Sequence, residues 1–315
     1  MKDQWGREIT YLRLSVTERC QLNCAYCRGY REHAEQRELA AEEFARIARA
    51  MAALGVKKVR LTGGEPLLRE DILMIISGLR AISGIEEITL TTNGQLLPGK
   101  ARLLKDAGLT RINISMDSLD AARYRSITGG GELAQVLTGI REAIEVGLVP
   151  LKVNAVLMRG INDEEIDAFI GLTREQPVDV RFIELMPLGR GDVSRRVTGE
   201  EILKTRPWLT AIPPRYAGQP SADYVAEGHK GRIGFISPLS HRFCGLCNRV
   251  RVMSDGMLRL CLGVDNEISL KEALNQKDDA MLAQIIRDAV YQKPPSHRFE
   301  EDGFHSQKDM SRIGG

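Results

Sequence analysis

Short stretches rich in β-branched residues alternate with longer stretches of helical periodicity between residue 11 and about residue 187. Such alternation predicts repeated strand and helix units around a parallel sheet. Six strands are expected, at residues 11–17, 56–64, 87–94, 111–118, 151–157 and 178–187. The clearest helices between them are expected at residues 41–54, 68–82, 133–146 and 163–175. Gly55, Gly108 and Gly147 follow predicted helix ends, as is typical of C-terminal caps.

Polar side chains alternate with apolar ones along five of these strands, although parallel strands covered on both faces are normally apolar throughout. Lys58, Arg60 and Thr62, for example, alternate with Val59 and Leu61. Because successive side chains point to opposite faces of a strand, one face of the sheet is predicted to be apolar and the other polar. The predicted polar face also carries Arg13, Ser15, Thr17, Thr89, Thr91, Asn93, Asn113, Ser115, Asp117, Lys152 and Asn154.

An antiparallel sheet with one solvated face is a simpler explanation, but the helix-length connections between the strands argue against it. We expect instead an α/β fold in which the strand and helix units form a partial (β/α)6 barrel of the TIM type, with the helices outside and a polar lumen inside. Buried charges are costly unless they are paired. Lys58 and Arg60, side by side on the polar face, therefore predict an anion in the lumen.

The regular pattern ends near residue 187. Beyond it we expect a short helix near residues 200–205, strands at residues 223–226 and 232–236, and a helical stretch that ends near Tyr291. We therefore divide the chain into a barrel domain, residues 1–190, and a C-terminal region, residues 191–315.

Composition and charge narrow the choice of partners. The chain has 315 residues, and its 44 Lys and Arg against 42 Asp and Glu give a net charge of +2. This balance provides no general attraction to nucleic acids or membranes, so we expect neither as a partner. The N-terminus lacks the apolar core of a signal peptide, and no stretch approaches the roughly 20 apolar residues of a membrane span. We expect a soluble, cytoplasmic protein, in which closely spaced cysteines indicate metal ligands before disulfides.

The six cysteines of the chain form two groups of three, which we call the first triplet (Cys20, Cys24 and Cys27) and the second triplet (Cys244, Cys247 and Cys261). Three thiolates are one fewer than a closed structural zinc site or a fully ligated iron-sulfur cluster needs, so each triplet leaves one coordination position vacant. The first triplet lies on the loop after the first strand, where a parallel barrel places its active site. Zinc stays an alternative for both groups, with His241 as a fourth ligand for the second.

The first triplet has the spacing CxxxCxxC with an aromatic residue at Tyr26, and the sequence GGEP follows the next strand at residues 63–66. In this combination the chain resembles the radical S-adenosylmethionine (SAM) superfamily. The resemblance implies a four-iron cluster whose exposed iron binds SAM and whose electron cleaves it to a 5′-deoxyadenosyl radical. It also implies that the cofactor is lined by Tyr26, Gly64, Ser115 and Met186.

A closer resemblance extends over nearly the whole chain. The segments LRLSVTERCQLNCAYC, KKVRLTGGEPLLR, INISMDSLD, VRFIELMPLG and CGLCNRVRVMSDGMLRLCL, together with the terminal GG, are similar to the GTP 3′,8-cyclase family of molybdenum cofactor biosynthesis. One segment departs from the family pattern, because Arg28-Gly29-Tyr30 follows the first triplet where Met-Pro is usual. The loop around the first cluster is therefore expected to run differently.

The family resemblance implies a second four-iron cluster on the second triplet, whose open iron contacts the guanine of GTP. It implies a substrate site formed by Arg13, Lys58, Arg60, Thr91, Lys152, Arg181, Arg249, Val250, Arg251, Gly314 and Gly315, in which Arg13, Arg249 and Arg251 are the expected catalytic residues. The side-by-side Arg249 and Arg251 suit phosphate, whereas a solvated charge pair is the simpler explanation for them. For Gly314 and Gly315 an ordinary frayed terminus is the alternative.

The implied reaction is the radical cyclisation of GTP to (8S)-3′,8-cyclo-7,8-dihydroguanosine 5′-triphosphate. An electron donor, the next enzyme of the pathway and a second copy of the chain in a homodimer are the expected partners. Two other functions stay open at this point. One is a peptide-modifying radical SAM enzyme, whose auxiliary domain usually needs more than three cysteines, and the other is a zinc-dependent nucleic-acid-binding protein.

Overall fold

The computed structural model describes residues 1–27, 37–216, 218–299 and 309–314. The unusual Arg28-Gly29-Tyr30 segment and Gly315 lie outside the described residues, so the expectations attached to them stay predictions.

Six parallel strands form the centre of the sheet and lie next to one another in the order in which they occur along the chain. This arrangement confirms the repeated strand and helix units that the sequence predicts, and each observed strand lies within a predicted one. The strands are β1 (Tyr11–Ser15), β2 (Lys58–Thr62), β3 (Glu87–Thr92), β4 (Arg111–Ser115), β5 (Leu151–Leu157) and β6 (Val178–Glu184).

Strands from the second half of the chain extend both edges of this sheet. On one edge β10 (Arg249–Val252) pairs in parallel with β1 and continues into the antiparallel β11 (Met257–Arg259) and β12 (Glu267–Ser269). On the other edge β9 (Ile233–Ile236) pairs in parallel with β6 and leads to β8 (Ala222–Val225) and β7 (Thr210–Ile212). In the described part of the chain one sheet therefore unites residues on both sides of the predicted boundary at residue 190.

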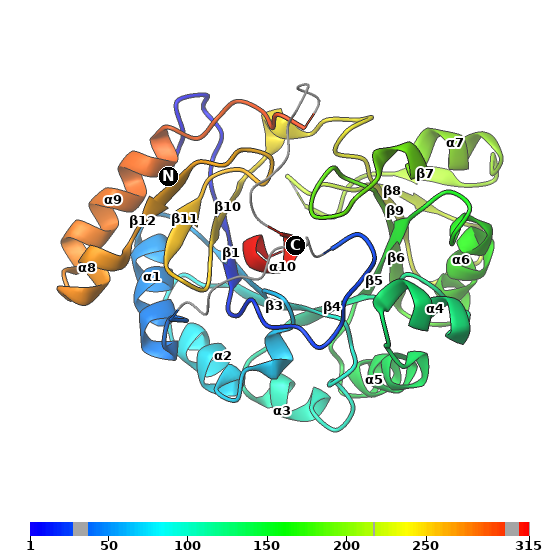
Figure 1. The fold of residues 1–315 in the computed structure, drawn as a ribbon, viewed down its shortest axis with the longest axis horizontal. Coiled ribbons are helices and arrows are strands. Elements are labelled where there is room, and N and C mark those ends of the chain that lie inside the picture. The colour runs from blue at the N-terminus through cyan, green and yellow to red at the C-terminus, as the bar shows by residue number, and fades with distance from the viewer. Residues whose placement is uncertain (28–36, 217, 300–308, 315) are drawn as a thin grey trace.

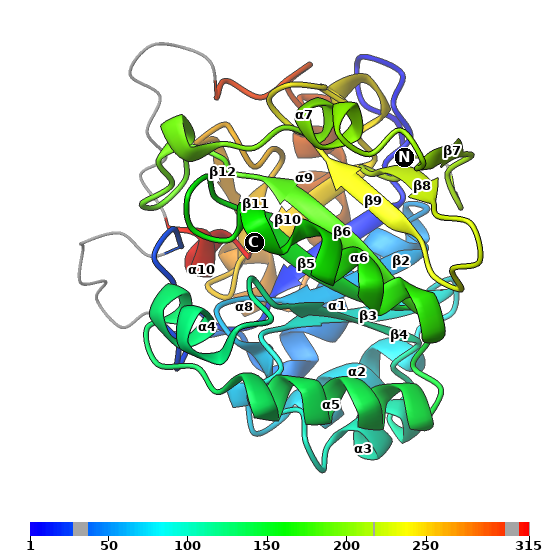
Figure 2. The same cartoon turned by 90° about the vertical axis from the view of Figure 1, so that its right-hand side faces the viewer.

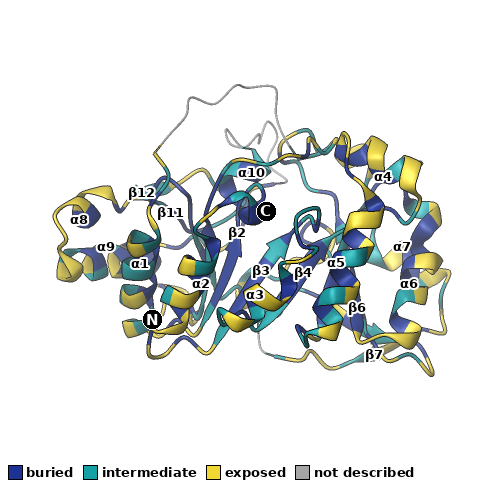
Figure 3. Ribbon diagram, turned by 90° about the horizontal axis from the view of Figure 1, so that it is seen from below, coloured by how far each residue is buried: buried dark blue, intermediate teal, exposed yellow. Residues whose placement is uncertain are grey.

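Amphipathic helices cover the outside of the central strands, with buried inner faces and exposed outer faces (Figure 3). They are α1 (Ala41–Ala53), α2 (Ile72–Arg80), α3 (Ala101–Asp106), α4 (Ala121–Thr128), α5 (Leu133–Glu145) and α6 (Ile166–Glu175). Helix α2 begins four residues later than predicted, because Pro66–Leu68 forms a separate 3-10 turn that Glu65 caps. The C-terminal half adds α7 (Gly199–Lys204), α8 (Lys271–Asn275), α9 (Asp279–Tyr291) and α10 (Met310–Ile313).

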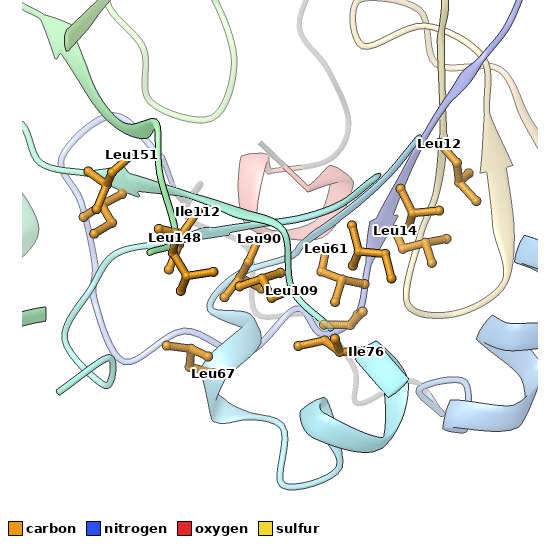
Figure 4. Packing of buried hydrophobic residues seen from close by; sticks show 14 of the residues in the cluster. Leu12, Leu14, Leu61, Leu67, Ile76, Leu90, Leu109, Ile112, Leu148 and Leu151 are labelled. Atoms are coloured by element: carbon orange, nitrogen blue, oxygen red, sulfur yellow. The ribbon is translucent and has the colours of Figure 1, made fainter. Parts of the chain in front are cut away.

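The apolar face of the sheet packs against these helices. Leu12 and Leu14 of β1, Leu61 of β2 and Leu90 of β3 are fully buried there, and Figure 4 shows them packed with residues such as Ile76 of α2. Each such side chain contributes about 1.5–3 kcal/mol when it is removed from water. The apolar side chains of the alternating strands therefore determine which face of the sheet packs against the helices. The opposite, polar face lines the lumen.

Helix α10, at the C-terminal end of the described chain, lies inside the arc of strands and not on the outer surface (Figures 1 and 2). Two hydrogen bonds agree with this position: the Ser15 hydroxyl donates to the carbonyl oxygen of Arg312 over 3.3 Å, and the amide of Met310 donates to the carbonyl oxygen of Cys27 over 3.3 Å. The end of the chain is thus part of the lumen.

Candidate active site

The first triplet lies at the carboxyl end of the parallel strands, on the loop that leaves β1. The amide of Cys27 donates to the carbonyl oxygen of Cys24 over 3.0 Å, so the second and third cysteines are joined by one tight turn. The side-chain amide of Asn93, which follows β3, lies 3.8 Å from the Sγ atom of Cys20. All three cysteines are partly exposed, as ligands that must reach a bound group require.

The Gly63-Gly64 turn after β2 packs directly on the backbone of the loop that carries the first triplet. A Cβ atom on Gly63 would lie 2.3 Å from the carbonyl oxygen of Thr17, and one on Gly64 would lie 2.3 Å from that of Arg19. The Gly63 φ angle of +149° is a second reason for glycine there. The amide of Gly64 donates to the Thr17 oxygen over 2.8 Å. Loop packing therefore explains the two glycines, and contact of Gly64 with the cofactor stays a prediction.

Tyr26 and Ser115, both predicted to line the cofactor, lie near the same end of the lumen. The Tyr26 hydroxyl donates to a carboxylate oxygen of Asp117 over 2.8 Å, and Asp117 follows Ser115 at the end of β4. Burial raises the pKa of Asp117 to about 6, against the opposing effect of hydrogen bonds from the Val156 amide and Tyr26. The fourth predicted residue, Met186, follows β6 and packs on the small apolar cluster that includes Ile313 of the tail.

Arginine side chains form a row across the lumen face of three neighbouring strands. Arg13 of β1 pairs in register with Arg60 of β2 on one side and with Arg251 of β10 on the other. The sequence pattern predicts the first two on one face, and the structure adds Arg251 from 238 positions further along the chain. Burial, together with the charges of nearby Arg60 and Arg249, lowers the pKa of Arg13 to about 10 despite the opposing effect of Tyr11. Three guanidinium groups from three different strands therefore lie side by side on the lumen face of the sheet.

Tyr11 and Thr91 contact the arginine row from the strands themselves. Arg60 donates through Nε to the Tyr11 hydroxyl oxygen and through Nη1 to the Thr91 hydroxyl over 2.9 Å. Burial alone would raise the pKa of Tyr11, but the charges of Arg60, Lys58 and Arg13 outweigh it and lower the pKa to about 7. Tyr11 lies two residues before Arg13 on β1, so its side chain points to the same face of the sheet. Extending the alternation to Tyr11 would therefore have placed it in the lumen.

A second basic region is formed by residues near the amino ends of β2, β4 and β5 and by one residue in the middle of β6. Lys58 and Arg111 both form ion pairs with Glu87 of β3, at 3.0 Å for Lys58. Lys152 of β5 is 2% exposed and Arg181 of β6 is 6% exposed. Burial, and next the charge of Arg181, lower the pKa of Lys152 to about 8. Five basic residues that the sequence assigned to the substrate, Arg13, Lys58, Arg60, Lys152 and Arg181, are thus brought together around one lumen.

The second triplet lies at the opposite, amino end of the strands. Cys244 and Cys247 form a turn, with the Cys247 amide donating to the Cys244 carbonyl over 3.1 Å, just before β10 begins at Arg249. Arg249 pairs in register with Tyr11, the first residue of β1. β1 has five residues, and each residue of a strand rises about 3.3 Å. The two cysteine loops, at opposite ends of this strand, are therefore separated by about 13 Å or more along the strand direction.

Two cations that the sequence analysis missed support the second cysteine loop. Arg7, held by Asp3 at 2.6 Å, donates to the carbonyl oxygens of Cys244 over 2.9 Å and of Pro295 over 3.0 Å. Lys293, which is 2% exposed, donates to the carbonyl oxygen of Leu260. Neither residue lies within a recognisable motif, because each acts on a loop that is more than 30 residues away in sequence.

Arg249 and Arg251 face the lumen, whereas Val250 between them does not. Val250 is 1% exposed and belongs to the apolar core between the sheet and the helices. Its side chain therefore lies on the face opposite the predicted substrate site, so that only its backbone is available to a ligand. The buried Nε atom of Arg249 has no hydrogen-bond partner within the described chain. A ligand in the lumen would supply that partner.

The described end of the chain places a carbonyl group on the arginine row. The carbonyl oxygen of Gly314 accepts hydrogen bonds from Arg251 over 2.6 Å and from Arg13 over 3.3 Å. Arg312 anchors this segment through an ion pair of 3.1 Å with Glu18, on the loop that leads to the first triplet. A Cβ atom on Gly314, whose φ is +69°, would lie 2.8 Å from Thr62. Glycine is therefore needed there for close approach, and a frayed terminus does not describe residues 309–314.

Comparison with known proteins identifies the family to which this chain belongs. A family model described as the Radical SAM superfamily matches residues 14–173, and one described as Molybdenum Cofactor Synthesis C matches residues 178–299. The GTP 3′,8-cyclase of Peptoclostridium acidaminophilum is 44% identical over 99% of this chain and 98% of its own length. That of Petrotoga mobilis is 42% identical over the full length of both chains.

The chain belongs to the radical SAM superfamily and, within it, to the GTP 3′,8-cyclase family. It is a radical SAM enzyme, whose cofactors are SAM and four-iron clusters, as the sequence analysis expected. The crystal structure of Streptococcus suis SuiB bound to the precursor peptide SuiA covers 94% of this chain and 68% of its own, with a TM-score of 0.66 at 17% identity. This similarity confirms the α/β partial barrel with a C-terminal extension. Within the described residues no helix is long and apolar enough to span a bilayer.

The residues of this radical SAM enzyme fit the cofactors of the family. Thiolates are the ligands that iron-sulfur clusters require, and each cysteine triplet leaves one iron of a four-iron cluster open. Near the second triplet, burial would raise the pKa of Cys247, but the charges of Arg249 and Lys293 outweigh it and lower the pKa to about 7. These charges therefore favour the thiolate form of Cys247, whereas burial raises the pKa of Cys261.

Proposed function

We propose that this radical SAM enzyme converts GTP to (8S)-3′,8-cyclo-7,8-dihydroguanosine 5′-triphosphate, an early step of molybdenum cofactor biosynthesis. One observation carries the proposal. Two cysteine triplets lie at opposite ends of a lumen in which Arg251, Arg13 and Arg60 stand side by side. A nucleoside triphosphate has an anionic end and a base with donor atoms, and this lumen has a matching site for each.

We assign the cluster that binds SAM to the first triplet, with Tyr26, Gly64, Ser115 and Met186 around the cofactor. When bound there, cluster and SAM would supply a 5′-deoxyadenosyl radical, the chemistry needed to remove the C3′ hydrogen of the ribose so that C3′ can bond to C8 of guanine. One further electron, from the electron donor, and one proton would complete the dihydro product. Asp117 holds the Tyr26 ring through its 2.8 Å hydrogen bond, and Asn93 lies next to Cys20. These contacts orient the loop at the end of the lumen where the reaction begins.

We assign the second cluster to Cys244, Cys247 and Cys261, with its open iron toward the guanine. Arg13, Arg249 and Arg251 are proposed as the catalytic residues because they lie between this loop and the carboxyl end of the lumen. Lys58, Arg60, Thr91, Lys152 and Arg181 are proposed to bind the triphosphate. Holding both ends of the substrate keeps the two reacting carbons together, an effect that can lower a barrier by about 7–11 kcal/mol.

The tail is proposed to be part of the same site. The Gly314 carbonyl contacts Arg13 and Arg251, so that Gly314, and with it Gly315, would border the substrate. A tail in this position helps to keep water away from a carbon radical. The reaction also requires an electron donor, and the product passes to the next enzyme of the pathway. The homodimer stays a prediction from the resemblance.

The test is an anaerobic assay of the purified enzyme with dithionite, SAM and GTP. The expected result is about eight irons per chain, from two four-iron clusters, together with 5′-deoxyadenosine and a cyclised nucleotide in equal amounts. Deoxyadenosine without any change in GTP would assign the chain to another radical SAM reaction. Stoichiometric zinc in place of iron would contradict both cluster assignments.

A further inference from the structure

Tyr216 lies in the second basic region, although no strand or motif carries it there. It belongs to the proline-rich connection between β7 and β8, and its hydroxyl lies 3.1 Å from the Nζ atom of Lys152. Three cations lie over its ring: Lys58 Nζ at 4.8 Å from the ring centroid, Lys152 Nζ at 5.4 Å and Arg111 Cζ at 5.6 Å. The preceding Arg215 forms an ion pair of 3.0 Å with Asp179 of β6, which anchors the connection to the barrel.

Positive charge exceeds negative charge around this ring. Lys58, Arg111, Lys152 and Arg181 contribute four cations from four different strands. Glu87 pairs with Lys58 and Arg111, and Asp179, which is in register with Lys152, pairs with Arg215. The excess acts on Tyr216. Burial alone would raise its pKa, but Lys152, Lys58 and Arg181 outweigh it and lower the pKa to about 6. The region therefore attracts an anion, and the Tyr216 hydroxyl lies within it, 3.1 Å from the Nζ atom of Lys152.

The hydroxyl of Tyr216 has the right chemistry to remain in the site when a phosphate arrives. A lysine ammonium can only donate hydrogen bonds, so Lys152 donates to the Tyr216 oxygen. The O–H bond of the phenol is then free to donate to another acceptor. A phosphate oxygen between the cations would provide that acceptor, and its negative charge would return Tyr216 to the protonated form in which it can donate.

We propose that Tyr216 is a triphosphate-binding residue whose hydroxyl donates a hydrogen bond to a phosphate oxygen that Lys152 also binds. This inference rests on the proposed function, since it names a further residue of the same substrate site. Its ring also contacts Lys58, Lys152 and Arg111, and these cation–π contacts help to hold the three charged groups in place.

The test compares wild-type enzyme with Tyr216→Phe, in the form that carries its clusters, by equilibrium binding of GTP and of GMP. The phenyl ring keeps its contacts with the three cations, so folding and iron content should be unchanged. Loss of a hydrogen bond to a charged group is expected to weaken GTP binding by about 10- to 150-fold. GMP lacks the outer phosphates, so both proteins should bind it equally. Tyr224→Phe is the matched control, because Tyr224 of β8 packs on Phe235 of β9 at the apolar core, outside the lumen.

Equal GTP affinity of wild type and Tyr216→Phe would overturn the inference while leaving the proposed function intact. Tighter GTP binding by the variant would also overturn it, because Tyr216 would then compete with the phosphates. An equal loss for GTP and GMP would indicate a general structural effect and would count against a role at the triphosphate. If the wild-type enzyme bound no GTP at all, the proposed function itself would fail.

Discussion

Lys152→Met should make the free protein more stable and the substrate complex weaker. Lys152 is 2% exposed and has Arg181 and Arg111 as neighbours, and no carboxylate forms an ion pair with it within the described chain. Methionine has a similar length and no charge, so it fits the same space without the electrostatic cost. A residue kept for binding a ligand is expected to be costly when that ligand is absent.

The magnitude follows from the pKa of Lys152, which is lowered from 10.5 to about 8, chiefly by burial. One pKa unit corresponds to about 1.4 kcal/mol, so the charged form costs the folded state about 3 kcal/mol. Because the pKa of the folded protein is lower than that of the unfolded chain, this cost is complete below pH 8 and disappears above pH 10.5. Tyr216 loses a cation in the variant, which reduces the expected gain to about 1–3 kcal/mol at pH 7.

The assay is anaerobic urea unfolding of both proteins at pH 7 and pH 9.5. With a slope of about 3 kcal/mol per molar, the variant should unfold at a urea concentration about 0.3–1 M higher at pH 7. The difference should fall to about half at pH 9.5, because wild-type Lys152 is then largely neutral. The affinity for GTP should fall by about 10- to 150-fold, since a charged hydrogen bond to phosphate is lost.

The control is Lys57→Met. Lys57 immediately precedes β2, is exposed and forms a surface ion pair of 3.0 Å with Glu86. Surface pairs contribute about 0–1 kcal/mol, so this variant should be slightly less stable and bind GTP normally. An unchanged or lower urea midpoint for Lys152→Met at pH 7, or a difference that does not shrink at pH 9.5, would refute the claim that the lumen is electrostatically strained without its ligand.

Three further variants test the geometry of the site. Gly64→Ala should lower the iron content from about eight to about four per chain, measured by iron analysis, because its Cβ would clash with the Arg19 carbonyl and displace the first triplet; unchanged iron would show that the loop adapts. Arg249→Ala should leave the iron content intact and weaken GTP binding at least about 10-fold; loss of iron would mean a structural role. Arg312→Ala removes the ion pair with Glu18 and should make the C-terminal tail cleavable by carboxypeptidase while the barrel stays folded; a resistant tail would mean that its backbone contacts suffice.

The local sequence was enough to predict the strands of the central barrel and which of their side chains face the lumen. The two-residue alternation along β1, β2 and β3 reflects a backbone geometry that every strand shares, so it identified both the strands and the lumen-facing Arg13 and Arg60. Glycine at positions 63 and 64 signalled a close approach, but what approaches there, the backbone of Thr17 and Arg19, became known only from the structure.

The edges of the sheet were harder to predict. Strands β7, β11 and β12 have three residues each, too few for an alternating pattern to appear. The local sequence of a strand does not show which distant strand it will pair with, so the parallel pairing of β10 with β1 could not be predicted. Val250, assigned to the substrate site with its neighbours, has its side chain in the apolar core. The strand alternation that places Arg249 and Arg251 on one face already implies this position.

The residue types, their spacing and their alternation established the two cysteine triplets, the strand order of the central barrel and the basic character of its lumen. These features depend on ligand chemistry and on the geometry of a single strand, both of which can be recognised within a few residues. The tertiary structure alone decided that the triplets lie at opposite ends of the lumen, that Arg251 is in register with Arg13, and that Tyr216 enters the lumen. It also places Gly314, which the family resemblance had assigned to the substrate site, on the arginine row. Those contacts join residues 63 to 301 positions apart, where packing and charge, not sequence proximity, determine which side chains meet.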